Sequence, residues 1–242
     1  MKRLFDFVAS TLGLTLLSPI LFPVTLLVWL TDGKSPFYIA PRVGRDGKIF
    51  QMVKLRSMVI DADKLGIDST KTNDSRITPI GHFIRRYKFD EIFQLWNVVK
   101  GDMSLVGPRP NVKRETDLYT DIEKKLFSVR PGITDPSSIV FSDLGDILKD
   151  YSDPDLAYNQ LVRPWKSRLS IAYIENQTFL LDIKLILITI IAIFSREIAL
   201  QEVNKVLLQM DVDDLLIKIA SRKVELYPFP PLGATEIVVS RH

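Results

Sequence analysis

The chain has 242 residues, 46% of them hydrophobic, which allows one good-sized domain with a real core plus an appendage. Thirty-two Lys and Arg against 29 Asp and Glu give a formal net charge of +3, and there is no Lys/Arg-rich run with interleaved aromatic residues, so nucleic acid is not expected as a partner. Without cysteine and with only two histidines, a disulfide framework, zinc chemistry and a Ser-His-Asp triad are poor hypotheses.

Residues 7–30 form an apolar segment without a charged residue. As one straight helix this segment would be about 36 Å long, enough to cross a bilayer core of about 30 Å. Ser18 and Pro19 stand at its middle, however, and Pro23 follows. A proline inside a helix removes a backbone hydrogen bond and favours a kink, so each half would reach only about 18 Å, roughly half of the hydrocarbon thickness.

Basic residues flank this apolar segment on both sides. Lys2 and Arg3 precede it, and six Lys and Arg residues follow between positions 34 and 56. Because cytoplasmic flanks collect Lys and Arg, both ends are expected on the cytoplasmic side. A kinked helical hairpin that enters one leaflet and returns satisfies both observations. A simple bitopic span and a cleaved signal peptide are the alternatives.

Residues 37–58 predict a β-hairpin, because two β-rich runs flank the turn pair Asp46-Gly47. Lys54 and Arg56 alternate with apolar neighbours on the second run and so share one strand face. Two cations there could meet a pyrophosphate or simply be solvated. The polar residues 61–78 then predict a loop or a short helix.

The next segment predicts a short helix over residues 80–87 and a second helix over residues 89–100, which Gly101 ends. The second helix has apolar residues at helical spacing, namely Ile92, Leu95, Trp96 and Val99. Asp90 and Glu91 lie in its first turn, beside free backbone N–H groups and the positive end of the helix dipole, with Arg85 and other basic residues just upstream. A phosphate could rest there, but Asp90 would equally suit a helix N-cap.

Four further helical segments are expected in the second half of the chain. Leu118, Ile122 and Leu126 recur every four residues, which predicts a packed helical stripe. Ser152-Asp153-Pro154 is typical of a helix start. Residues 179–194 are apolar but too short for a comfortable span, so they predict a buried or interfacial helix. Residues 197–223 are expected to be helical and residues 227–232 extended.

Several stretches closely resemble the bacterial sugar transferases, a family of monotopic phosphoglycosyl transferases. Residues 85–110 read R-R-Y-K-F-D-E-I-F-Q-L-W-N-V-V-K-G-D-M-S-L-V-G-P-R-P and match nearly every specified position of the family's catalytic segment, with Phe89 and Ile92 as mild departures. The start K-R-x-F-D, the Ser18-Pro19 break and the hairpin residues also match. The resemblance covers about residues 1–195.

The resemblance implies a reaction. A phosphosugar would move from a nucleotide diphosphate sugar, here a UDP-sugar, to polyprenol (undecaprenyl) phosphate at the cytoplasmic face of the bacterial inner membrane. This would be the first membrane step in making a capsule, O-antigen, exopolysaccharide or glycoprotein. By the same resemblance, Asp90 would form a covalent aspartyl-phosphosugar with release of UMP, and Glu91 would help to hold Mg²⁺.

The resemblance also implies which residues meet the substrates. Positions expected to contact nucleotide or phosphate oxygens are Lys54, Arg56, Arg85, Pro108, Arg109, Pro110 and Arg130. Gln94, one turn after Asp90, would either orient a substrate or join a buried polar network. Asp135 stands where the family commonly has Gly, which leaves the reaction type intact and puts the identity of the sugar in doubt.

The expected fold class is mixed α/β and mostly helical, with a small β-hairpin and amphipathic interfacial helices. The expected parts are a re-entrant membrane helix over residues 1–33, a catalytic domain over residues 34–195, and a helical extension over residues 196–242 of open role. Homo-oligomerisation and contact with downstream glycosyltransferases also stay open. The rival functions are a bitopic anchor that presents a non-catalytic nucleotide-binding module, and a soluble nucleotide-binding module that a partner brings to the membrane.

Overall fold

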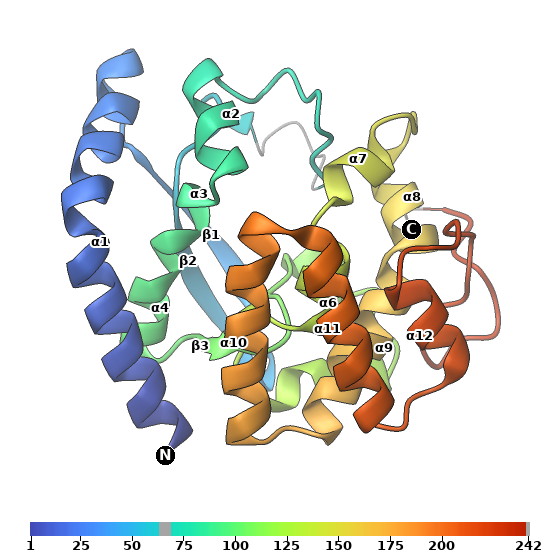
Figure 1. The fold of residues 1–242 in the computed structure, drawn as a ribbon. Helices are drawn as coiled ribbons and strands as arrows, with labels where there is room; N and C mark the ends of the chain where they lie inside the picture. Colours follow the sequence, from blue (N-terminus) through green and yellow to red (C-terminus); the bar gives the residue numbers. More distant parts are fainter. Residues whose placement is uncertain (63–68, 241–242) are drawn as a thin grey trace.

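A 31-residue helix, α1 (Lys2–Asp32), lies along one side of the other elements in a computed structural model that describes residues 1–62 and 69–240 (Figure 1). The helix is continuous through Pro19 and Pro23, where the sequence predicts two limbs joined at a kink. The Ser18 hydroxyl donates to the Thr15 carbonyl at 2.7 Å beside the first proline. Within the described residues, α1 is the one helix long and apolar enough to cross a membrane.

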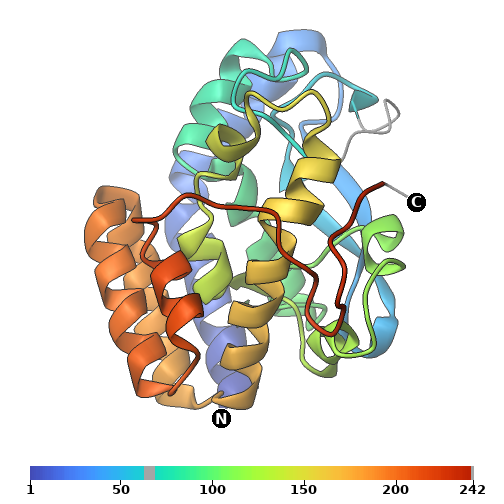
Figure 2. The ribbon, with the colours of Figure 1, turned by 90° about the vertical axis from the view of Figure 1, so that its right-hand side faces the viewer.

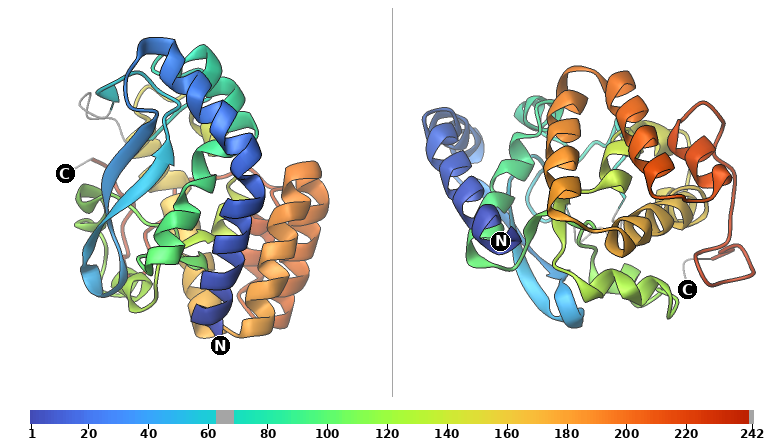
Figure 3. Two further views of the ribbon diagram at one scale, coloured as in Figure 1. Left: turned by 90° about the vertical axis from the view of Figure 1, so that its left-hand side faces the viewer. Right: turned by 60° about the horizontal axis from the view of Figure 1, so that its bottom comes forward.

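Both ends of α1 are attached to the same folded body. At its start, the Lys2 amine lies 2.5 Å from Asp182, and the Arg3 guanidinium donates to the last carbonyls of α4 (Gln94–Lys100), at 2.7 Å for Val99. At its end, Val28 packs in one apolar cluster with Leu55 and Ile84, as Val24 does. The left view of Figure 3 shows α1 running from the helical half of the molecule to the top of the hairpin. The face of α1 turned away from the body exposes large apolar side chains, including Leu4, Leu16, Phe22 and Leu30.

The predicted β-hairpin is confirmed. Strands β1 (Phe37–Val43) and β2 (Ile49–Leu55) pair antiparallel, and their connection contains the short 3₁₀ turn η1 (Arg45–Gly47). Asp46 and Gly47 have φ values of 57° and 73°, the left-handed conformation that a tight hairpin turn requires at both central residues. Of the polar segment that follows, residues 63–68 lie outside the described part of the chain.

The segment that carries the acidic pair forms three short helices instead of two. Helix α2 (Pro79–Arg86) is as predicted, but the second helix divides into α3 (Phe89–Ile92) and α4, with a break at Phe93. Asn97 ties α4 to the hairpin, because its side chain accepts from the backbone N–H of Val53 and donates to the carbonyl of Gln51. Trp96 of the predicted apolar face is 51% exposed, because the buried side of α4 is formed by Gln94, Asn97 and Val98.

A second, parallel pair of strands connects the two halves of the molecule. Strand β3 (Ser104–Val106) pairs with β4 (Gly132–Thr134), with Ser104 opposite Gly132 and Val106 opposite Thr134. The backbones approach so closely beyond β3 that a Cβ atom on Gly132 would lie 2.1 Å from the backbone nitrogen of Gly107. Only glycine fits there. This contact fixes the direction in which the following loop, residues 108–111, leaves the sheet.

The predicted helical stripe at residues 118–126 is wrong. The chain forms the short helix α5 (Lys113–Thr116), a turn, and the 3₁₀ helix η3 (Glu123–Ser128). Leu118 and Ile122 are 40% and 41% exposed, whereas Glu123 is fully buried. The reason is a long-range ion pair, since the carboxylate of Glu123 lies 2.5 Å from the guanidinium of Arg163.

The largest apolar core lies among the helices of the second half. These are α6 (Pro136–Val140), α7 (Leu144–Leu148), α8 (Pro154–Leu161), α9 (Arg163–Glu175), α10 (Phe179–Phe194), α11 (Arg196–Gln209) and α12 (Asp214–Ala220). Their buried side chains form one cluster, so residues beyond 195 share the core of those before it. The predicted starts at Asp153 and Phe179 are confirmed, with Asp153 and Thr178 as N-caps.

The end of the chain lies across α8 and α9 as an extended segment (Figure 2). The Phe229 ring centroid is 4.4 Å from that of Trp165, and the Phe229 N–H donates to the Gln160 carbonyl at 3.0 Å. The Gln160 amide in turn donates to the Val238 carbonyl at 2.7 Å. These contacts cover the side of α9 that includes the fully buried Trp165.

Candidate active site

Asp90 is a buried carboxylate without a complete set of partners. It lies at the second position of α3, and the N-cap is Lys88, which has a left-handed backbone with φ of 59°. Asp90 is therefore not the helix cap that its sequence position would also suit. Its side chain is 8% exposed, and Oδ1 has no hydrogen-bond partner. Burial and the neighbouring Glu91 raise the pKa of Asp90, although Lys54, Arg85 and Lys88 oppose that rise.

Glu91 is held by two cations from distant parts of the chain. Its Oε1 lies 2.5 Å from the Arg109 guanidinium and 4.0 Å from the Lys54 amine. Burial would raise the pKa of Glu91, but Arg109 and Lys54 outweigh it and hold that pKa well below its ordinary value. Burial lowers the pKa of Lys54 to about 8, with Arg109 acting in the same direction. The hairpin, α3 and the loop after β3 thus meet at one charged cluster.

Two more of the predicted residues lie beside this cluster. Arg85 is half-buried, and its charge acts on both Asp90 and Asp74. Gln94 is 1% exposed and its Nε2 has no hydrogen-bond partner. Asp90 on α3 and Gln94 at the start of α4 are four residues apart, so two unsatisfied polar atoms occur close together in the sequence. Buried polar groups are almost always paired, so both atoms require a partner that the protein does not supply.

Arg109 connects the charged cluster to two adjoining cavities. One lies toward the hairpin and includes Val43, Gly44 and Phe127 in its lining, and the other lies toward α9. Pro108 and Arg109 line both cavities, and Pro110 lines the first. The prolines fix the backbone on each side of Arg109, which keeps its guanidinium at the junction.

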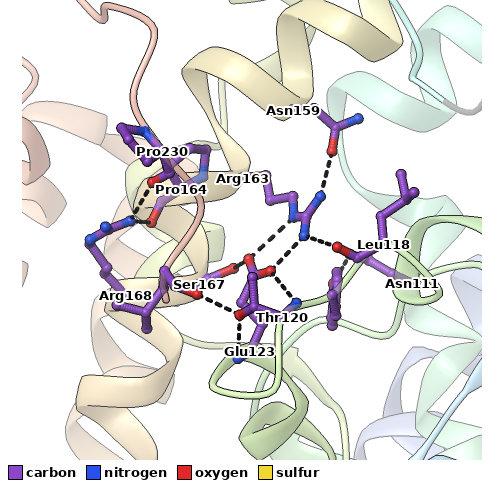
Figure 4. A network of polar contacts seen from close by, with 12 residues as sticks. Asn111, Leu118, Thr120, Glu123, Asn159, Arg163, Pro164, Ser167, Arg168 and Pro230 are labelled. Carbon is purple, nitrogen blue, oxygen red and sulfur yellow. Dashed lines mark hydrogen bonds and ion pairs between the residues drawn. The ribbon is translucent and has the colours of Figure 1, made fainter. Parts of the chain in front are cut away.

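A buried ion-pair network forms the wall of the α9 cavity (Figure 4). Arg163 contacts Glu123, donates to the Asn159 amide oxygen at 3.0 Å and also donates to the Leu118 carbonyl at 2.5 Å. Ser167 donates to the same carboxylate of Glu123 at 2.7 Å. Since Arg163 is satisfied within the protein, it shapes the cavity without offering its charge to a ligand.

Two other predicted substrate-binding residues form contacts within the protein. Arg56 lies just beyond β2 and makes a two-pronged ion pair with Asp32 at the end of α1, with N–O distances of 2.5 and 2.6 Å. The Arg130 Nε donates to the Gly101 carbonyl at 2.9 Å. Arg56 therefore attaches the hairpin to α1, and Arg130 attaches β4 to the end of α4, and neither residue contacts the charged cluster through these bonds.

Asp135, the departure from the family pattern, is fully buried and completely engaged. Its carboxylate caps α6 through the Ser138 N–H at 2.8 Å and also accepts from the hydroxyls of Ser137, Ser138 and Ser170. The carboxylate thus fixes the two serines, Ser137 and Ser170, that line the α9 cavity. Asp135 acts on the cavity through these hydroxyls.

Lys166 on α9 is a residue that the sequence analysis missed. It lines the α9 cavity together with Arg109, and its amine lies 5.7 Å from the centre of the Tyr158 ring. The surrounding sequence, P-W-K-S-R, contains no motif that would have singled it out. Within the described residues, no cluster of three or more His, Cys, Asp or Glu side chains is arranged to hold a metal ion.

A carboxylate pair surrounded by cations is suited to binding phosphate groups and a divalent cation. Comparison with known sequences agrees, since the bacterial sugar transferase profile matches residues 1–196. The chain belongs to the bacterial sugar transferase family.

The chain is similar to several named members of that family. It is 32% identical to the uncharacterized sugar transferase EpsL of Bacillus subtilis (strain 168) over 206 residues, 85% of this chain and 93% of the relative. It is 42% identical to a UDP-galactose-lipid carrier transferase of Erwinia amylovora and 40% identical to an undecaprenyl-phosphate galactose phosphotransferase of Salmonella typhimurium (strain LT2), each over 149 residues. These two matches cover 55% of this chain but only 31% of the relatives' own length.

Proposed function

We propose that this protein transfers a phosphosugar from a nucleotide diphosphate sugar to polyprenol phosphate by way of a covalent aspartyl intermediate. The single observation that carries the proposal is the buried Asp90 carboxylate, with an unpartnered oxygen, beside three cations on separate elements. Two relatives are named as transferases that act on a lipid carrier or on undecaprenyl phosphate, which supports the same class of acceptor.

The first step forms the intermediate. An oxygen of Asp90 attacks the β-phosphorus of the donor, the bond from that phosphorus to the bridging oxygen breaks, and the nucleoside monophosphate leaves with the electron pair. Lys54 and Arg109 are placed to neutralise the charge that gathers on the phosphate oxygens. A raised pKa makes Asp90 a more basic and hence better nucleophile once it is ionised, and the nearby cations favour the ionised form.

The second step releases the product. A phosphate oxygen of the polyprenol phosphate attacks the phosphorus of the aspartyl-phosphosugar, and the bond from phosphorus to Asp90 breaks. The carboxylate is regenerated and a polyprenyl diphosphate sugar results. Dividing one displacement between two charged substrates into two attacks avoids bringing both substrates to the site at once.

The acidic pair also suits a magnesium ion. Mg²⁺ in phosphoryl transfer takes one or two carboxylates together with substrate phosphates, and Asp90 and Glu91 are adjacent carboxylates, one with an unpartnered oxygen. Glu91 would help to hold the ion, which would supply positive charge to the diphosphate and the leaving group. Addition of EDTA should then stop the first step, and Mg²⁺ should restore it.

The proposal also locates the protein at the cytoplasmic face of the inner membrane, with α1 as a re-entrant helix. Lys2 and Asp32, at opposite ends of α1, both bind the same folded body, which supports a helix whose two ends stay on one side. The chain has no native cysteine, so single cysteines at Lys2 and Lys48 can be labelled selectively in intact spheroplasts. Equal protection of both positions from an impermeant thiol reagent is expected, and labelling of one alone would establish a bitopic span.

The experiment that tests the mechanism uses the purified full-length protein with a UDP-sugar and no lipid acceptor. Mass spectrometry should find the phosphosugar on Asp90, with one UMP released per adduct. Asp90→Asn should form no adduct and no product, and Gln94→Ala should still form the adduct on Asp90. An adduct on another side chain, or turnover that requires both substrates together, would refute the covalent route.

A further inference from the structure

The cavity beside α9 is polar and is not explained by the charged cluster at Asp90. Its lining includes the amine-bearing Lys166, the guanidinium of Arg109, the amide of Asn111 and the side chains of Ser137 and Ser170. Apart from the engaged Arg163, the cavity offers two cations, Lys166 and Arg109, and one remaining N–H of the Asn111 amide, whereas the hydroxyls of Ser137 and Ser170 already donate to Asp135. This donor set is suited to the oxygens of a phosphate.

Lys166 is a partly buried cation without an acidic partner. Within the described part of the chain, its amine forms no hydrogen bond and no ion pair, and it lies over the face of the Tyr158 ring. The charges of Asp135, Glu115 and Glu91 favour the protonated amine from a distance, but Asp135 is engaged by Ser137 and Ser170 and Glu91 by Arg109. Burial and the nearby Arg109 lower the pKa of Lys166 to about 8, so the amine is still mainly charged at neutral pH.

A buried amine such as that of Lys166 destabilises the folded protein unless an anion compensates its charge. Arg109 does not compensate it, because it has the same sign and its own partner is Glu91. The geometry therefore calls for an anionic ligand between the Lys166 amine and the Arg109 guanidinium.

The surroundings of the cavity favour a water-soluble ligand over a lipid headgroup. Large exposed apolar side chains are concentrated on α1 and α10, for example Leu16 and Phe194. Helices α8 and α9, which bear Tyr158 and Lys166, have no large apolar side chain among the exposed ones. An isoprenoid chain would lie against α1 and α10, so its phosphate would approach Asp90 from the opposite side.

We infer that the α9 cavity binds the nucleotide-side phosphate of the donor, with Lys166 as a phosphate-binding residue that shares this ligand with Arg109. The inference rests on the proposed function. Arg109 contacts Glu91 beside Asp90 and also lines the cavity, so a diphosphate held at Arg109 would have its β-phosphate near Asp90 and its α-phosphate near Lys166. Lys166 would then also hold the departing nucleoside monophosphate.

The test measures binding of inorganic pyrophosphate, UDP and UMP to the full-length protein by calorimetry, without turnover. Lys166→Gln should weaken all three by about tenfold or more, the contribution of one charge-assisted hydrogen bond. Lys166→Arg should retain most of the affinity. Lys218→Gln, which removes the same charge from an exposed position on α12, is the matched control and should bind like the wild type.

Steady-state kinetics then separate the two phosphate substrates. Lys166→Gln should raise the KM for the UDP-sugar and leave the KM for undecaprenyl phosphate unchanged. A rise in the KM for the lipid alone would place the acceptor phosphate in this cavity and overturn the inference. Unchanged binding of pyrophosphate and UDP would overturn it as well.

A measurement on the wild-type protein covers the case in which Lys166→Gln does not fold. Acetylation of lysine amines in the presence and absence of UDP should show protection of Lys166 and none of Lys218, and equal modification of Lys166 in both conditions would contradict the inference. Asp90→Asn distinguishes failure of the proposed function, because that variant should lose transfer and keep the Lys166-dependent binding of UDP. Wild-type turnover in Asp90→Asn would remove the covalent mechanism alone.

Discussion

Replacing Asp90 by Asn should abolish transfer and, at the same time, make the protein more stable. The Asp90 carboxylate is 8% exposed, and one of its oxygens has no partner. Its raised pKa shows that burial and Glu91 together outweigh the attraction of Lys54, Arg85 and Lys88 for the ionised form. The folded protein therefore carries a buried charge that destabilises it, so removing this charge should raise the free energy of unfolding.

The size of the gain follows from the unsatisfied group. An unsatisfied buried polar group costs about 1–3 kcal/mol and a charged one costs more, so removing the charge of Asp90 while keeping a polar group should gain on the order of 1–3 kcal/mol. For a chain of this length, each kcal/mol corresponds to about 2–4 °C in Tm. A rise of about 2–12 °C is expected for Asp90→Asn at pH 7.5, since the amide has almost the same shape and no charge.

The pH dependence of the difference in stability between Asp90→Asn and the wild type follows from the direction of the pKa shift. The unfolded pKa of Asp90 is 3.8 and the folded pKa is higher. Below 3.8 both states are protonated and the charge costs nothing. As pH rises from 3.8 through the folded pKa, the wild type loses stability while Asp90→Asn does not. The difference in Tm between the two proteins should therefore be largest above the folded pKa and vanish toward pH 4.

Thermal unfolding of the detergent-solubilised protein, followed by circular dichroism, measures this difference. Asp74→Asn is the matched control, because Asp74 is paired with Arg76 at 2.6 Å and its pKa is lowered by that contact. That variant should lose stability at neutral pH. A Tm of Asp90→Asn equal to or below that of the wild type at pH 7.5 would refute the reasoning about Asp90.

Two further predictions concern the cations. Lys54 and Lys166 both have pKa values of about 8, so kcat/KM for the donor should fall as pH rises through about 8, and a variant with both lysines replaced by Arg should shift that limb to higher pH. An unchanged limb would remove the two amines from donor binding. Arg56→Asp should weaken the attachment of α1 and increase proteolysis near residue 33 without changing the KM for the donor, and the added change Asp32→Arg should restore resistance. If Arg56→Asp raises the KM for the donor and the added Asp32→Arg does not lower it again, Arg56 belongs to the substrate site.

Local residue chemistry determined much of the fold. The Asp46-Gly47 turn requires only the backbone freedom of its own residues, and the starts of α8 and α10 require only a capping side chain followed by helix-forming residues. The position of Asp90 and Glu91 in the first turn of a helix is likewise predicted by the helical spacing of the apolar residues after them. The motif from Arg85 to Pro110 also sufficed to recognise the family.

Contacts between distant segments decided the rest. Glu123 is buried because Arg163, 40 residues later, pairs with it, and this inverts the exposure that the spacing of Leu118 and Ile122 predicts. The ion pair between Arg56 and Asp32 and the pairing of β3 with β4 likewise join segments distant in the sequence, so no local pattern predicts them. The α9 cavity arises in the same way, since the loop after β3 places Arg109 opposite Lys166 only when both chain halves are packed. The sequence by itself predicts local structure, because helix caps and turns depend on neighbouring residues. Ion pairs and burial depend on segments distant in the sequence, so only the tertiary structure decides them.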